Sequence, residues 1–267
     1  SRQGKKVTSF NFYGMSPPFP INGYLISGFI PWKYLRKATH PPAFFDKIKN
    51  KPGFDYKHLG MDISQEKKAI TGLRESEYEA WLDMQSERDA AWTELLADTM
   101  AEDPCDLTAI VYDGTDKIQH LFWRYLDPAL VEANPSAFDA KIREKCLSYY
   151  RQIDAAIERL VTLAGPETNV LLASDHGFGE TTEFVYINEW LAEQGYLTWA
   201  KDSHLDESGA LTADTIKEHT VMIDWENTVA YSLTPSSNGV FIKLDTGNGK
   251  GIKASDYPAF VAKLQEQ

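Results

Sequence analysis

The sequence predicts an α/β fold with a largely parallel sheet, because short apolar runs alternate with long amphipathic helical patterns. Three apolar or aromatic runs predict strands, and they cover residues 7–13, 107–112 and 170–173. A long helix is predicted between the last two runs, over residues 136–163, because its apolar residues follow helical spacing and Gly165-Pro166 ends the pattern. A strand, a helix and a further strand in this order predict a right-handed parallel crossover.

The other elements follow from the same kind of pattern. A second long helix is predicted over residues 75–101, and Pro104 follows it. Residues 16–68 are rich in proline, glycine and aromatic side chains and are too long for a plain connection, so they predict an inserted cap. Residues 200–224 are polar with little periodicity and predict a second insertion. We expect one domain to span residues 1–267.

Composition limits the classes of partner. The 267 residues carry 27 Lys and Arg against 39 Asp and Glu, a net charge of −12 that repels nucleic acid and anionic membranes. An anionic substrate would therefore need a local reversal of charge, which a bound cation supplies economically. No apolar run is long enough to cross a bilayer, so the chain as given is predicted to be soluble. Nothing in the sequence indicates a cellular compartment or an oligomeric state.

The first group of chemically capable residues comes directly after the second predicted strand. Asp116 and His120 are four residues apart, so on a helix they lie on one face and can bind the same cation. The carboxyl ends of parallel strands are also where ligands collect in open α/β sheets. The alternative is that Asp116 caps the helix that carries the apolar residues 121–123.

The second group, Asp175 and His176, follows the third predicted strand. Gly177 and Gly179 come next and allow a tight turn in which both side chains converge. The alternative is an ordinary turn with an exposed histidine. Because both groups end strands of one predicted crossover, we expect them on the same edge of the sheet. Their mixed oxygen and nitrogen donors suit Zn²⁺ or Mn²⁺ better than Ca²⁺, with Mg²⁺ or iron also compatible.

Residues 116–123 and 174–179 resemble the metal-binding signatures of the type I phosphodiesterase/nucleotide pyrophosphatase family, within the alkaline phosphatase superfamily. Residues 22–29, 188–197 and 224–231 resemble further segments of bacterial and archaeal members, in the same order. The resemblance implies an alkaline-phosphatase-like three-layer α/β/α core with cap insertions. It also implies a hydrolase that acts on phosphoric ester or pyrophosphate bonds of a small phosphorylated substrate, with nucleotides among the candidates.

The resemblance further implies two divalent cations, most typically zinc, with manganese or magnesium as alternatives, bridged by the substrate phosphate. By matching positions, Asp116 and His120 would bind one ion, and Asp175 and His176 the other. The Thr or Ser nucleophile of the family has no match in this sequence, so the catalytic nucleophile is expected upstream of the first residue. One further histidine ligand of the family is expected beyond the last residue.

On this interpretation the sequence is a fragment with an incomplete core, and it carries part of a two-metal site. Four side chains leave each of two tetrahedral ions with about half of its ligands, so we expect the isolated chain to hold such ions weakly. The leading hypothesis is a metal-dependent phosphoester hydrolase. A catalytically silent fragment or binding scaffold of the same fold, and a related sulfatase or phosphomutase, remain as alternatives.

Overall fold

The described residues form two compact units, Ser1–Glu180 and Thr181–Gln267. The structure is a computed structural model, and it describes residues 3–200, 222–234, 237 and 239–267. Each unit is described by itself. That a single domain spans residues 1–267 stays a prediction.

A four-stranded sheet lies at the centre of the first unit, in the order β3-β2-β1-β4. Its strands are β1 (Val7–Phe12), β2 (Gly23–Ser27), β3 (Thr39–His40) and β4 (Leu107–Ile110). Strand β1 is parallel to both β2 and β4, whereas β3 runs antiparallel to β2. The strands expected in residues 7–13 and 107–112 are therefore present, and the predicted α/β class is confirmed.

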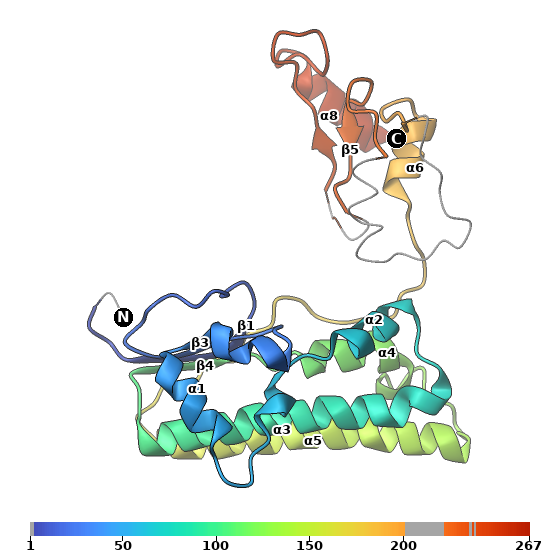
Figure 1. Ribbon diagram of the computed structural model, residues 1–267. Coiled ribbons are helices and arrows are strands. Elements are labelled where there is room, and N and C mark those ends of the chain that lie inside the picture. The colour runs from blue at the N-terminus through green and yellow to red at the C-terminus, as the bar shows by residue number, and fades with distance from the viewer. Residues whose placement is uncertain (1–2, 201–221, 235–236, 238) are drawn as a thin grey trace. The chain divides into compact units, whose positions relative to one another are not determined.

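Long helices lie beside this sheet, and Figure 1 shows α3 and α5 running side by side beneath it. Both coincide closely with the helices predicted from apolar spacing. Helix α5 begins where the Ser136 hydroxyl accepts a hydrogen bond from the Asp139 amide, and it ends at Gly165, which has a φ of 86°. The helical elements of this unit are η1 (Trp32–Ala38), α1 (Pro42–Lys49), η2 (Tyr56–Leu59), α2 (Ile63–Thr71), η3 (Glu75–Glu77), α3 (Tyr78–Glu102), α4 (Gly114–Leu126) and α5 (Ala137–Ala164).

The third predicted strand, in residues 170–173, is wrong. These residues have no strand structure, and the Leu171 and Leu172 side chains are 88% and 71% exposed. Among the described residues β4 pairs only with β1, so the run has no partner along the sheet edge. A short apolar run favours an extended backbone but does not specify which strand it pairs with. The predicted parallel crossover is therefore absent from the described structure.

Residues 16–68 contain part of the sheet rather than only irregular structure. Strand β2 lies inside the sheet between β1 and β3, and helix α1 contributes Phe44 and Phe45 to the core. The proline-rich and glycine-rich surroundings of residues 23–27 concealed the short apolar run of β2. That a cap lies within residues 16–68 stays a prediction. The insertion predicted over residues 200–224 falls mostly outside the described residues.

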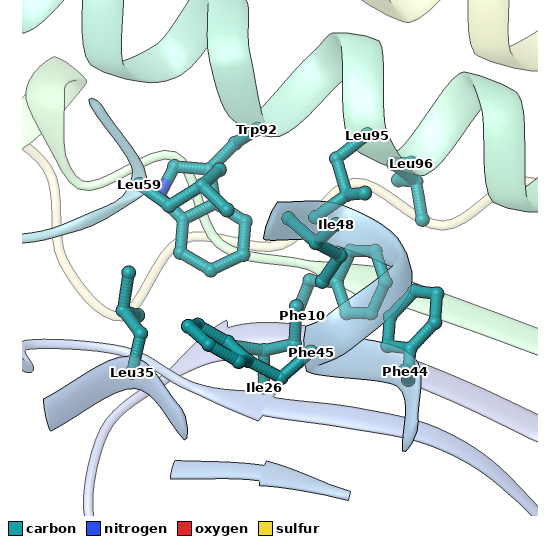
Figure 2. Packing of buried hydrophobic residues seen from close by; sticks show 10 residues of the cluster. All are labelled: Phe10, Ile26, Leu35, Phe44, Phe45, Ile48, Leu59, Trp92, Leu95 and Leu96. Carbon is teal, nitrogen blue, oxygen red and sulfur yellow. The ribbon is translucent and has the colours of Figure 1, made fainter. Parts of the chain in front are cut away.

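The core of the first unit forms where the sheet meets α1 and α3. The strand register places Phe10 of β1 opposite Ile26 of β2 and Ile110 of β4. Figure 2 shows Trp92, Leu95 and Leu96 of α3 pointing toward these strands, with side chains of α1 between them. The buried members of this cluster are Phe10, Ile26, Leu35, Phe44, Phe45, Ile48, Leu59, Trp92, Leu95 and Leu96. Tight packing of large side chains on one face thus attaches α3 to the sheet.

The second unit has its own small core. Buried residues of this core include Leu191, Ile223 and Ala230. Strands β5 and β6 pair antiparallel, and the unit has two described helices, α6 and α8. The elements are α6 (Ile187–Glu193), β5 (Ala230–Tyr231), β6 (Phe241–Ile242) and α8 (Tyr257–Glu266). Across the described part of the chain, no helix is long and apolar enough to cross a membrane.

Substitution of Phe10 tests this description of the core. Phe10→Ala removes a fully buried ring from beneath α3, so we expect the free energy of unfolding to fall by about 3–5 kcal/mol. Urea unfolding followed by circular dichroism measures the change. Phe19 is 55% exposed and provides a matched control, for which the alanine variant should stay within about 0.5 kcal/mol of the wild type. Equal losses in the two variants would contradict the assignment.

Candidate metal centre

Helix α4 presents the first pair of predicted ligands. Asp116 lies in the first turn of α4 and His120 one turn later, with 3.4 Å between Asp116 Oδ1 and His120 Nε2. The capping position is taken by Asp113, so Asp116 does not cap the helix. A carboxylate in the first turn is favoured there by the helix dipole. Both side chains are about half exposed and accessible to a ligand.

The loop that follows α5 presents the second pair. The Ser174 hydroxyl donates a hydrogen bond to the His176 carbonyl, and His176 Nδ1 lies 2.8 Å from the Gly177 carbonyl oxygen. Because a carbonyl can only accept, Nδ1 carries the proton in this contact, and Nε2 keeps its lone pair in the neutral ring. The Gly177 contact and the Asp175 charge raise the pKa of His176. The Asp175 side chain is 91% exposed.

The structure brings His120 and His176 close to Asp116, whereas Asp175 approaches only its sequence neighbour His176. His176 Nε2 lies 3.5 Å from Asp116 Oδ1 and 3.8 Å from Asp175 Oδ2. Asp116 Oδ1 is thus within 3.5 Å of an imidazole nitrogen from each of two segments far apart in the sequence. The two histidines with the carboxylates make a donor set that suits Zn²⁺. As placed, no group of three or more such side chains in the described residues is arranged to hold a metal ion.

Comparison with known proteins identifies the family. The family model described as type I phosphodiesterase / nucleotide pyrophosphatase matches residues 1–254. The chain belongs to this family. No curated protein and no solved structure matches it. Type I phosphodiesterases are hydrolases that act on phosphoester bonds of small phosphorylated substrates such as nucleotides, and they are generally metal-dependent.

In this phosphodiesterase-family chain, a buried network of charges lies beside the start of α4. Asp113 Oδ2 lies 2.8 Å from Arg88 Nη2 and 2.9 Å from Lys117 Nζ, and Oδ1 accepts a hydrogen bond from Asn11 Nδ2. Glu66 of α2 binds the same two cations. Burial opposes ionisation of Asp113, but Arg88 and Lys117 outweigh it and lower its pKa. The network connects α2, α3 and α4 beside the turn that carries Asp116, the first of the predicted metal ligands.

A second buried carboxylate supports the same turn. Asp89 Oδ2 accepts a hydrogen bond of 2.6 Å from the Tyr149 hydroxyl of α5. A Cβ added at Gly114 would lie 2.4 Å from that oxygen and 2.5 Å from the hydroxyl, so only glycine fits at the first residue of α4. Burial raises the pKa of Asp89 to about 6 and outweighs the opposing effect of Arg88.

Arg88, Asp89 and Asp113 were not among the site residues predicted from the sequence. One signal for the first two was present, since both lie three or four residues from Trp92 on the helix face that also carries Trp81 and Leu82. Charged residues on an apolar helix face indicate buried partners. Their partners come from segments distant in sequence, and spacing along one helix does not reveal them.

The pH dependence of stability tests the buried state of Asp89. Because its folded pKa of about 6 exceeds the unfolded value near 4, the folded protein binds the proton more tightly. Its contribution to the unfolding free energy is therefore greatest below about pH 4 and falls by about 2–3 kcal/mol as the pH rises to 7. Asp89→Asn cannot titrate and should lose this dependence.

Urea unfolding of the wild type and Asp89→Asn at several pH values between 4 and 7 measures the effect. The difference between the unfolding free energies of the wild type and Asp89→Asn should change with pH. A constant loss of stability caused by the asparagine side chain does not affect this change. Asp154 is exposed, so Asp154→Asn should follow the pH profile of the wild type. A constant difference between Asp89→Asn and wild type across this range would contradict a raised pKa.

Proposed function

We propose that this chain carries part of a two-metal site that hydrolyses phosphodiester or pyrophosphate bonds. The observation that supports the proposal best is the approach of His120 and His176 to the same oxygen of Asp116, within 3.5 Å. These residues come from α4 and from the loop after α5, which the long helix α5 separates in the sequence. Two imidazoles and a carboxylate meeting across such a distance are typical of a metal centre.

Asp116 and His120 are the proposed ligands of one ion, and Asp175 and His176 those of the other. We propose zinc because neutral imidazole and carboxylate donors suit it. A divalent ion here would polarise a phosphoryl oxygen and stabilise the charge that develops during phosphoryl transfer. The Gly177 carbonyl holds the His176 ring so that Nε2 faces Asp116, which is the orientation that a ligand nitrogen needs.

The charge of the chain supports the same proposal. Asp116 and Asp175 add negative charge to the candidate metal centre of a protein whose net charge is −12. Without a metal ion this surface repels phosphate. The proposed substrate is a small phosphorylated molecule, with nucleotides as the favoured class. The family match supports the phosphodiesterase branch over related sulfatases and phosphomutases.

A second candidate function is a binding scaffold without its own reaction centre. The observation that favours it is the incomplete set of ligands, since no three donors are grouped to hold an ion in the described residues. A scaffold would bind metal or phosphorylated ligands weakly and would not turn them over. Metal content and hydrolysis measured on the same preparation distinguish the two candidates.

Removal of the shared carboxylate and one histidine tests the proposed metal centre. The double variant Asp116→Asn with His176→Gln deletes a charge and a nitrogen donor from the point where the two segments meet. We expect bound zinc, measured by plasma mass spectrometry after purification without chelator, to fall at least tenfold relative to wild type. Hydrolysis of bis(p-nitrophenyl) phosphate should fall with it.

The matched control is His58→Gln with Asp154→Asn, which replaces an exposed histidine and an exposed carboxylate elsewhere in the same unit. The control should retain the zinc content and hydrolysis of the wild type. A wild type that binds neither zinc nor manganese would contradict the proposed metal centre. Stoichiometric zinc without hydrolysis would support the scaffold instead.

A further inference from the structure

One aromatic side chain contacts both histidines of the candidate metal centre. The Phe178 ring lies 4.8 Å from the His120 ring, centroid to centroid, at an interplanar angle of 84°. It lies 5.9 Å from the His176 ring and 5.6 Å from the Trp123 ring. The edge-to-face arrangement with His120 is a favoured geometry for aromatic pairs. Phe178 therefore occupies the space between the two metal-binding segments.

These contacts attach the loop after α5 to one face of α4. Asp116, His120 and Trp123 lie on successive turns of α4, and His176 and Phe178 of the loop contact all three. The hydrogen bonds described for the loop are local, such as that from the Ser174 hydroxyl to the His176 carbonyl. The described contacts of the loop with α4 are thus the approach of His176 Nε2 to Asp116 Oδ1 and the packing of the Phe178 ring against His120 and Trp123.

The exposure of the histidines explains why a neighbouring ring matters. The side chains of His120 and His176 are 63% and 53% exposed, so burial restricts neither imidazole, and the Gly177 carbonyl contacts only that of His176. A metal ion that binds freely rotating ligands must overcome the entropy lost when they are ordered. Phe178 restricts both rings before any ion binds, because it packs against each of them.

We propose that Phe178 is a positioning residue that orients His120 and His176 toward Asp116 and so increases the affinity of the centre for metal. The inference rests on the proposed function, since it assigns a role within the same site. It makes Phe178 neither a ligand nor a catalytic residue. Its ring acts through the two imidazoles, and the Trp123 ring supports it from α4.

Three substitutions test this role. Phe178→Leu keeps an apolar side chain but removes the ring, and Phe178→Tyr keeps the ring. Phe184→Leu is the matched control, because Phe184 is 79% exposed and lies six residues further along the chain. Thermal unfolding of each variant first verifies that it folds.

The first measurement needs no metal. In the proton NMR spectrum of the metal-free chain, the ring current of Phe178 should shift the carbon-bound protons of the His120 imidazole. The shift should disappear in Phe178→Leu and persist in Phe178→Tyr and Phe184→Leu. An unshifted His120 in the wild type would overturn the inference without reference to the proposed function.

The second measurement is zinc affinity, determined by competition with a chromophoric chelator. We expect affinity to fall about tenfold in Phe178→Leu and to stay near the wild-type value in Phe178→Tyr and Phe184→Leu. Failure of the wild type to bind zinc would refute the proposed function before any variant is compared. Zinc binding that is unchanged in Phe178→Leu would overturn the positioning role alone.

Discussion

The buried carboxylate of Asp113 is the interaction on which the arrangement of the first unit depends. It comes directly after β4 and binds Arg88 of α3 and Lys117 of α4, while Asn11 at the end of β1 donates to its other oxygen. Strand β1 and helices α3 and α4 thus all contact one buried charge. Removing a single partner from such a buried pair generally costs about 3–5 kcal/mol, because it leaves an unpaired charge away from water.

This network positions one of the two pairs of proposed metal ligands but not the other. Asp116 follows Asp113 by three residues, and Gly114 between them packs against Asp89 and Tyr149, so buried groups determine where the first turn of α4 lies. Asp175 has no comparable support, since its side chain is 91% exposed. The proposed ligands on α4 are therefore positioned by buried groups, whereas those on the loop after α5 contact α4 at the surface.

Elements with a strong local pattern were predicted from the sequence, and elements that depend on tertiary pairing were not. The long amphipathic helices α3 and α5 and the strands β1 and β4 were predicted because each has a strong local pattern. Strand β2 was missed because its five residues lie among prolines and glycines, and its pairing with β1 is a tertiary property. Residues 170–173 have the composition of a strand, yet in the described structure they lack a partner along the edge of β4. Short segments owe their conformation to neighbours that spacing does not reveal.

The predicted site residues come together in a different way from the one that the sequence indicated. The pairing of Asp116 with His120 follows from helical spacing, and α4 bears this out. Asp175 and His176 were expected beside them because both groups would end strands of one sheet, but the loop reaches α4 without that strand. The buried residues Arg88 and Asp89 could be suspected only as charges on an apolar helix face, and their partners Asp113 and Tyr149 had no such signal.

Electrostatics connects this architecture to the chemistry of the family. Asp113 is neutralised by Arg88 and Lys117, and Glu66 occupies the same two cations, so little positive charge of this network remains for a substrate. The exposed carboxylates of Asp116 and Asp175 then make the candidate metal centre negatively charged, so it repels phosphate. The proposed metal ion would reverse that charge, so under this proposal metal binds before a phosphorylated substrate does. On the same proposal, the four side chains Asp116, His120, Asp175 and His176 govern both steps, so contacts that orient them before an ion binds would favour both.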